Sequence, residues 1–445
     1  MKRHITSALA FFLAFAIAEA QYIPTEENLR SRREFADAGF GVFIHWGIYS
    51  MFAQGEWYLN SGISAEEYAK AASAFYPVRF DAASWVKDIK DAGAKYITIT
   101  SRHHDGFSMF GTRQSPYNIV DSTPFGRDII KELADECHKQ GIRLHLYYSH
   151  IDWGRPDYPK GRTGLKTGCR KEDENWKHYY DFMNNQLTEL LTNYGEIGAI
   201  WFDGYWDHDS DSVPFDWQLE KQYAMIHSLQ PGCLVGNNHH IKPFEGEDIQ
   251  IFERDIPGQN EAGLSGQEIS HLPLETCQTM NGMWGYKIAD QNYKSTDELV
   301  QLIVKAASKG SNLLLNIGPQ PDGCLPALSL DRLEGIGKWM RIYGESVYGT
   351  DPSGLAPQEW GVSVRKGNVL YLHVFDASAG KVSLSLADFK TVSSSKKSRK
   401  LKVKSVTALN GGSALTYNYA KDGTLTVNLP SGASGPDYVV AVSVM

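Results

Sequence analysis

The sequence predicts an α/β protein with a (β/α)8-like (TIM-type) barrel followed by a C-terminal antiparallel β-sandwich domain. Between about residues 35 and 350 of the 445-residue chain, short apolar runs alternate with amphipathic stretches. This pattern is typical of parallel strands covered by helices. After about residue 352, short segments alternate apolar and polar residues, as antiparallel strands with one solvated face do. The length of the first region suits a (β/α)8 barrel, which usually takes about 250 residues.

Unbroken apolar runs predict five of the barrel strands, because parallel strands are buried on both faces. These runs cover residues 40–45, 96–100, 143–148, 199–203 and 313–317. Helical patterns lie between them at residues 84–92, 128–140 and 176–194. Each helical pattern is followed by a glycine (Gly93, Gly141 and Gly195), the residue most favoured just after a helix C-terminus.

The chain is expected to contain three parts. Residues 1–20 read as a signal peptide, with a basic start, an apolar run over 5–17 and the small-x-small sequence Ala18-Glu19-Ala20. Residues 21–352 form the barrel and residues 353–445 the sandwich, with strands expected at 362–374, 381–387, 401–408 and 424–429. No run approaches the about 20 apolar residues of a membrane span. We therefore expect an exported, periplasmic or secreted protein without a membrane span.

Composition argues against nucleic acid as a partner. The net charge is −8 and the isoelectric point is about 6.0, whereas nucleic-acid-binding domains are usually basic. One basic run, residues 396–404, is expected to form a solvated loop and an edge strand. Aromatic residues make up 12 % of the chain, which is compatible with a ring-lined cleft.

Unusual polar residues follow four consecutive predicted strands. Because the carboxyl ends of barrel strands meet at one rim, we expect the side chains there to converge. The residues at these ends include His45, His103, His104, Tyr147 and Asp203. Imidazole, phenol and carboxyl groups, without a glycine-rich phosphate loop, suit a neutral polyhydroxylated ring. Glycoside cleavage requires two carboxyl groups, and Asp203, held by the strand before it, is the leading candidate for one of them.

Six segments, in order, resemble the α-L-fucosidases of glycoside hydrolase family 29. They are FGVFIHWG (40–47), EWY (56–58), HHDGF (103–107), WFDG (201–204), ETCQTMNGMWGY (275–286) and KGSNLLLNIGP (309–319). The resemblance implies a barrel-like catalytic domain with a C-terminal sandwich. It also implies exo-acting hydrolysis of terminal α-L-fucose from a fucosylated oligosaccharide or glycoprotein glycan, by a retaining double displacement without a metal or organic cofactor.

The resemblance also assigns roles to carboxyl groups. Asp203 matches the catalytic nucleophile. Glu253 matches the position of the acid/base in several members, while Glu275 matches an acidic residue that is an alternative for the same role. Glu261 is a weaker third choice. The acid/base needs a raised pKa, through apolar burial or through the nearby charge of the nucleophile.

The remaining matches concern the sugar. Six residues match fucose-binding positions: His45, Glu56, Trp57, His103, His104 and Tyr147. Trp206 and Trp284 are expected in the wall around the sugar's methyl group. Some relatives carry an arginine in a VNDR-like segment, where this chain has Val235-Gly-Asn-Asn238-His239-His240, so Asn238 or His239 is expected to replace that contact.

No metal site is expected. Adjacent histidines in an extended segment point to opposite faces, so neither His103-His104 nor His239-His240 forms a simple chelate. Two further functions stay open at this point: a barrel glycosidase that acts on another sugar, and a non-catalytic fucose-binding protein.

Overall fold

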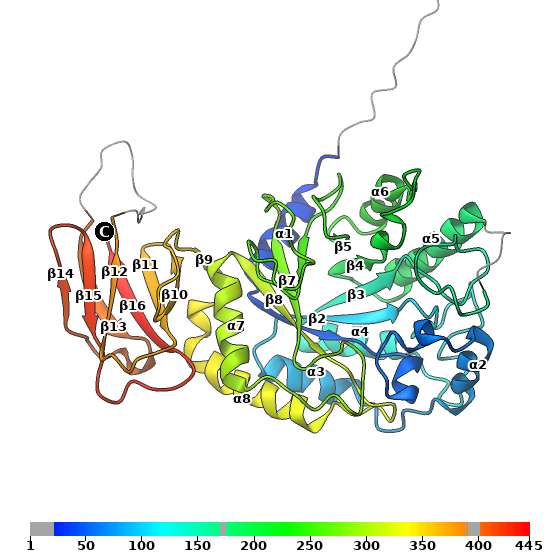
Figure 1. The fold of residues 1–445 in the computed structure, drawn as a ribbon, viewed down its shortest axis with the longest axis horizontal. Helices are drawn as coiled ribbons and strands as arrows, with labels where there is room; N and C mark the ends of the chain where they lie inside the picture. The colour runs from blue at the N-terminus through cyan, green and yellow to red at the C-terminus, as the bar shows by residue number, and fades with distance from the viewer. Residues whose placement is uncertain (1–21, 170–174, 388, 390–400) are drawn as a thin grey trace, which may run out of the picture.

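The computed structural model describes residues 22–169, 175–387, 389 and 401–445, which form a barrel and a sandwich side by side (Figure 1). The expected signal peptide, residues 1–20, lies outside the described residues, as do residues 396–400 of the basic run. Within the described ranges, no helix combines the length and apolarity needed to cross a bilayer.

Eight parallel strands form the barrel, in the order β5-β4-β3-β2-β1-β8-β7-β6. They are β1 (Phe40–Ile44), β2 (Tyr96–Arg102), β3 (Arg143–Ser149), β4 (Ala199–Asp203), β5 (Leu234–Asn238), β6 (Gln250–Glu253), β7 (Leu274–Thr279) and β8 (Ser311–Ile317). A parallel bridge between Gly236 and Ile249 brings β5 and β6 together, so the barrel is almost closed. The predicted fold class is confirmed.

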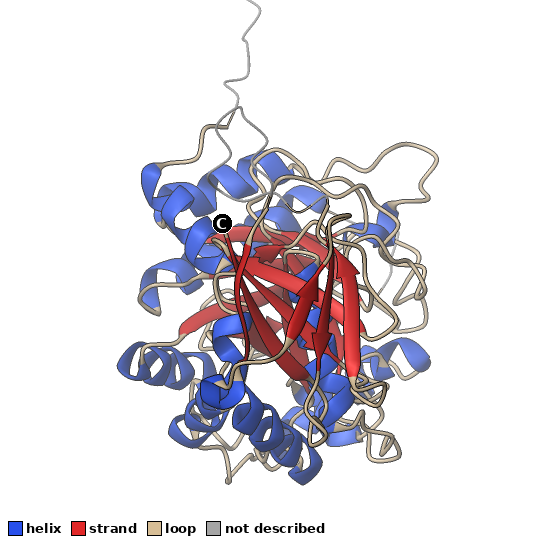
Figure 2. Ribbon diagram, turned by 90° about the vertical axis from the view of Figure 1, so that its left-hand side faces the viewer, coloured by secondary structure: helices blue, strands red, loops and turns tan. Residues whose placement is uncertain are grey.

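Helices surround the barrel strands (Figure 2). They are α1 (Glu26–Ala36), α2 (Ala65–Ala69), α3 (Ala82–Asp91), α4 (Ile129–Gln140), α5 (Trp176–Asn193), α6 (Leu219–Leu229), α7 (Thr296–Ser308) and α8 (Ala327–Tyr343). Helix α4 shows how local sequence sets their limits. Asp128 accepts a hydrogen bond from the Lys131 N–H at the start, and Gly141, with φ of 69°, ends the helix in the left-handed conformation that glycine adopts without strain.

The C-terminal region contains two antiparallel sheets, ordered β13-β16-β11-β10-β9 and β12-β15-β14. Their strands are β9 (Asp351–Pro352), β10 (Gly361–Lys366), β11 (Val369–Val374), β12 (Lys381–Ser385), β13 (Val403–Ala408), β14 (Tyr417–Tyr419), β15 (Thr424–Asn428) and β16 (Tyr438–Val444). The single strand expected at 362–374 was wrong, because a turn at Gly367 (φ 58°) divides it into the β10–β11 hairpin. Strand β13 lies at a sheet edge, as expected for the end of the basic run.

Helices α7 and α8 lie between the barrel and the sandwich (Figure 1). Gln301 of α7 donates a hydrogen bond to the Pro436 carbonyl across this contact, at 3.0 Å. On the sandwich side, His373 Nδ1 donates to Asp437 Oδ2 at 2.6 Å, and both side chains are fully buried. The ring of His373 lies 6.4 Å from that of Trp339 in α8. The two domains therefore share a packed interface. The predicted division after residue 352 falls in the segment between α8 and β10.

Candidate active site

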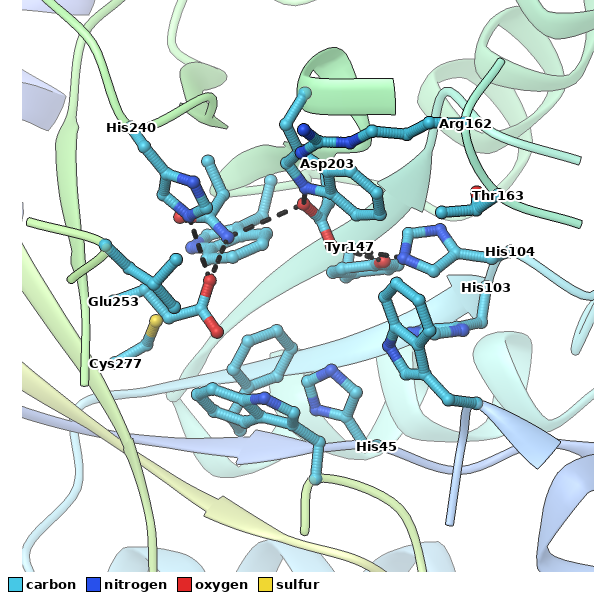
Figure 3. A pocket seen from close by; sticks show the side chains of 17 residues that line it. His45, His103, His104, Tyr147, Arg162, Thr163, Asp203, His240, Glu253 and Cys277 are labelled. Carbon is cyan, nitrogen blue, oxygen red and sulfur yellow. Dashed lines mark hydrogen bonds and ion pairs between the residues drawn. The ribbon is translucent and has the colours of Figure 1, made fainter. Parts of the chain in front are cut away.

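A cavity of about 290 Å³ opens at the carboxyl ends of the barrel strands (Figure 3). Seventeen residues line it, drawn from β1, β3, β4, β5, β6, β7 and the loops that follow the strands: Phe43, His45, Trp57, His103, His104, Tyr147, Arg162, Thr163, Trp201, Asp203, Trp206, Asn238, His240, Glu253, Leu264, Cys277 and Trp284. The predicted convergence of polar side chains at one rim is confirmed for His45, His103, His104, Tyr147 and Asp203. A cavity of this size and depth suits a single small ring.

Asp203 is the last residue of β4 and is held by donors on both oxygens. Its Oδ1 accepts hydrogen bonds from the Gly204 N–H (2.8 Å) and Trp206 Nε1 (2.9 Å), and its Oδ2 accepts one from the Tyr147 hydroxyl (2.9 Å). Gly204 has φ of 104°, and a Cβ there would lie 2.6 Å from Ile151. Only glycine therefore allows the turn that directs Asp203 into the cavity.

Burial, followed by the charge of Glu253, raises the pKa of Asp203 to about 6. The hydrogen bonds from Trp206 and Tyr147 act in the opposite direction, because they stabilise the ionised form. Asp203 is therefore a carboxylate above about pH 6, and its charge depends on the donors that surround it.

Glu253 ends β6 and faces the same cavity. Its Oε2 accepts hydrogen bonds from Asn238 Nδ2 at 2.8 Å and from His240 Nε2 at 3.0 Å. Burial raises its pKa, but the bond and charge of His240, the bond from Asn238 and the charge of Arg254 together hold the pKa below its ordinary value. The raised pKa expected of the acid/base is therefore not found at Glu253, because its hydrogen-bond donors outweigh its burial. The same Asn238 nitrogen lies 3.5 Å from Asp203 Oδ1, so one amide connects the two carboxyl groups.

Two histidines of the cavity, His45 and His104, are held neutral by burial. Burial lowers the pKa of His45 and of His104 to about 3. The Asn316 side chain donates its Nδ2 hydrogen bond to the Trp284 carbonyl, so its Oδ1 faces His45. His45 Nδ1 therefore donates to Asn316 Oδ1, at 2.6 Å. His104 Nδ1 lies 2.6 Å from Ser149 Oγ, and its Nε2 lies 3.5 Å from Asp203 Oδ2. In His45, Nε2 is left as an unprotonated acceptor, whereas Nε2 of His104 faces the Asp203 carboxylate.

Aromatic rings form the walls. Trp57 and Trp206 stack with their ring centroids 5.7 Å apart and 18° between their planes. The ring of Trp284 lies 5.2 Å from that of His45 and under the guanidinium of Arg254. The predicted placement of these tryptophans at the cavity is confirmed, and together they provide flat apolar surfaces for the C–H faces of a ring.

Glu275, the alternative acid/base, does not line the cavity, which corrects that prediction. It pairs in register with Ile251, whereas Glu253 pairs with Cys277, two residues nearer the rim. At about 3.3 Å per residue, Glu275 lies roughly 6–7 Å deeper in the barrel. There it accepts hydrogen bonds from Trp201 Nε1 (2.8 Å) and the Tyr96 hydroxyl (2.6 Å), and burial raises its pKa to about 7. Its contacts are those of a structural group.

Glu56 and His239 also lie outside the cavity lining, contrary to the expectation that they contact the sugar. Glu56 is buried and accepts a hydrogen bond from the Gly285 N–H at 2.7 Å, so it supports the loop that carries Trp284. His239 Nε2 bonds to Glu247, with distances of 3.0 and 3.1 Å to the two oxygens. The third carboxyl considered, Glu261, is exposed and does not line the cavity either.

Of the two residues expected to replace the arginine contact, Asn238 lines the cavity and His239 does not. The cavity residues His240, Arg162 and Thr163 were not predicted. Asn238 and His240 line the cavity, while His239 between them points away. The alternation of side chains along an extended segment predicts this pairing, so the signal was present. Arg162 and Thr163 come from the long loop after β3, and nothing in their local sequence indicates their position. Within the described ranges, no group of three or more His, Cys, Asp or Glu side chains is arranged to hold a metal ion.

Comparisons with known proteins agree with this geometry. The family model described as alpha-L-fucosidase matches residues 9–345. An alpha-L-fucosidase of Dictyostelium discoideum is 30 % identical over 368 residues, covering 76 % of each chain.

Solved structures give the same result. Alpha-L-fucosidase isoenzyme 1 from Paenibacillus thiaminolyticus superposes with a TM-score of 0.82 and 34 % identity, covering 94 % of this chain and all of the other. A family 29 alpha-L-fucosidase from Bacteroides thetaiotaomicron, solved as a trapped covalent intermediate, has a TM-score of 0.79 and 26 % identity, covering 98 % of this chain and 100 % of that one. The family model matches most of this chain, and the barrel rim holds two carboxyl groups that contact the same amide. This chain therefore belongs to the α-L-fucosidases of glycoside hydrolase family 29.

Proposed function

We propose that this chain is an exo-acting, retaining α-L-fucosidase that removes terminal α-L-fucose from fucosylated oligosaccharides or glycoprotein glycans. The observation that carries the proposal is the pair Asp203 and Glu253, which share the Asn238 amide in a cavity sized for one sugar. Retaining glycosidases hold their carboxyl groups about 5–5.5 Å apart, and a single amide nitrogen near both supports such a short separation.

Two steps complete the reaction. In the first, the Asp203 carboxylate forms a bond to the anomeric carbon while the bond to the leaving oxygen breaks, and Glu253 gives its proton to that oxygen. In the second, Glu253 takes a proton from water, the water oxygen bonds to the anomeric carbon, and Asp203 is released. The donors from Trp206 and Tyr147 support this role, because they favour the ionised form of Asp203.

The other predicted site residues would hold the sugar. The Nε2 atom of His45 can accept a hydrogen bond from a hydroxyl group. His103 Nδ1 is buried and has no hydrogen-bond partner among the described residues, so a hydroxyl could supply one. Trp57 and Trp284 would pack against the C–H face and the methyl group.

Rates on 4-nitrophenyl α-L-fucoside test the proposal. The wild type should hydrolyse it, and Asp203→Asn should lose at least about a thousandfold in kcat, since the covalent step disappears. Glu253→Gln should be rescued by azide, which needs no base to attack the intermediate. Glu275→Gln is the matched control, and azide should not accelerate it. A wild type that binds fucose without turnover would instead support a binding protein, and turnover only of another glycoside would support the other open alternative.

We also propose that residues 1–20 direct export to the periplasm or to the medium. The proposal rests on the basic start, the apolar run and the cleavage pattern of these residues. Expression of the full chain in a bacterial host tests it. Mass spectrometry of the mature protein should find Gln21 at the N-terminus, and an uncleaved cytoplasmic product would contradict it.

A further inference from the structure

We propose that His240 is a positioning residue for Glu253: with Asn238 it occupies Oε2, so that the catalytic proton is confined to Oε1. This inference rests on the proposed function. Both side chains donate to the same oxygen, Asn238 Nδ2 at 2.8 Å and His240 Nε2 at 3.0 Å (Figure 3). The other oxygen, Oε1, has no hydrogen-bond partner among the residues that the structure describes.

The donor directions lead to this assignment. A protonated carboxyl carries one O–H donor and one carbonyl acceptor. If the proton sat on Oε2, it would point at one of the N–H groups of Asn238 and His240, and at least one of their two bonds would be lost. With the proton on Oε1, Oε2 remains the acceptor of both bonds in either charge state. Glu253 can therefore give and take a proton without any rearrangement of the groups that hold it.

The backbone supports a specific role for His240. It has φ of 64°, in the left-handed region that only a few per cent of residues with a side chain adopt, although histidine occurs there more often than most. Of the four non-glycine residues with positive φ in the described part of the chain, two adjoin this carboxyl: His240, which bonds to it, and Arg254, which follows it. Strain of this kind persists where the surrounding structure requires it, often in active sites.

The position of His240 also connects Glu253 with solvent. The His240 side chain is 19 % exposed and the Glu253 side chain 14 %. Five other titratable or charged groups on the surrounding elements interact electrostatically with Glu253, so that its pKa or theirs is shifted: Asp203, Arg254, His45, Cys277 and Glu56. None of these five groups has a hydrogen bond to the carboxyl among the described residues, whereas His240 donates one. Its loss should raise the pKa of Glu253, because burial then acts with less opposition.

Two substitutions separate the donor from the side-chain volume. His240→Gly removes the donor, and glycine adopts φ of 64° without strain, so the variant should fold. His240→Gln keeps an N–H donor. Each variant is tested on 4-nitrophenyl α-L-fucoside, whose leaving group needs little protonation, and on phenyl α-L-fucoside, whose leaving group depends on the acid. Circular dichroism and thermal melting check the fold of both variants.

We expect His240→Gly to lose about tenfold more kcat/KM on the phenyl than on the nitrophenyl substrate, as for the loss of one bond to a charged group. The pKa of Glu253, followed by the NMR signal of its carboxyl carbon, should be higher in this variant than in the wild type, since burial then acts with less opposition. Added imidazole should restore part of the phenyl activity, and His240→Gln should retain most of it. Trp57→Phe, which alters the same cavity without touching Glu253, should lower both rates in similar proportion.

Three outcomes would overturn the inference. Equal losses on the two substrates would mean that His240 only supports the local structure. A Glu253 pKa that is the same in the variant and the wild type would mean that the His240 bond does not stabilise the Glu253 carboxylate. A wild type that hydrolyses neither fucoside would overturn the proposed function together with this inference, whereas an active wild type with equal losses in the variant overturns the inference alone.

Discussion

Replacing Trp206 by phenylalanine should move the acid limb of the pH–activity profile to higher pH. The indole Nε1 donates to Asp203 Oδ1 over 2.9 Å, and this bond lowers the pKa of Asp203 against burial and the charge of Glu253. Phenylalanine keeps a ring in the cavity wall but has no N–H. Because Asp203 must be ionised to attack, a higher pKa means that activity is lost at a higher pH when the solution is acidified.

The remaining bonds set the size of this shift. A hydrogen bond to a charged group contributes about 1.5–3 kcal/mol, and one pKa unit corresponds to about 1.4 kcal/mol. Tyr147 and the Gly204 N–H still donate to Asp203 in the variant, so the loss should lie near the lower limit of this energy range. We expect the pKa of Asp203 to rise from about 6 by about one unit.

The assay is kcat/KM on 4-nitrophenyl α-L-fucoside between about pH 4 and pH 9, because this ratio reports the ionisation of the free enzyme. Trp57→Phe is the matched control: Trp57 stacks on Trp206 in the same wall, and no hydrogen bond of the described residues joins it to Asp203. An acid limb that stays in place, or one that moves equally in both variants, would refute the reasoning. A shift to lower pH would mean that the bond stabilises the protonated carboxyl.

Three further predictions concern the barrel interior, the strand end and the sandwich. Burial raises the pKa of Glu275 from its ordinary value of about 4.5 to about 7, so folding takes up a proton in this range and stability falls as pH rises through it. Thermal melts should therefore show that the free energy of unfolding of Glu275→Gln rises relative to that of the wild type between about pH 5 and pH 8. The rise should be on the order of 2–3 kcal/mol at most. Gly204→Ala should push Asp203 out of place through the contact with Ile151, and kcat should fall about 100-fold with the melting temperature only slightly lowered. Asp437→Asn should lower unfolding stability by about 3 kcal/mol, because it removes the charged partner of buried His373, and the KM for the fucoside should not change.

The strands that the sequence predicted best are those with uniform apolar runs. Strands β1 to β4 and β8 coincide closely with the predicted segments, because strands buried on both faces need apolar side chains in both directions. Strands β5, β6 and β7 were not predicted. Their sequences LVGNN, QIFE and LETCQT carry polar residues, several of which point into the barrel where they meet partners from other strands. The sequence pattern of a short strand with polar residues does not differ from that of a loop, because the partners of those residues lie on other strands.

Sequence alone determined the fold class, the family resemblance and the nucleophile candidate, since these depend on local patterns and on an aspartate fixed to the end of an apolar strand. It did not separate Glu253 from Glu275, because both occupy neighbouring strands with similar composition. The parallel register of β6 and β7 separates their positions: it places the Glu253 carboxyl at the level of the cavity and the Glu275 carboxyl about two residues deeper, against Trp201 and Tyr96. Depth in a barrel is set by pairing between strands, and only the tertiary structure contains that information.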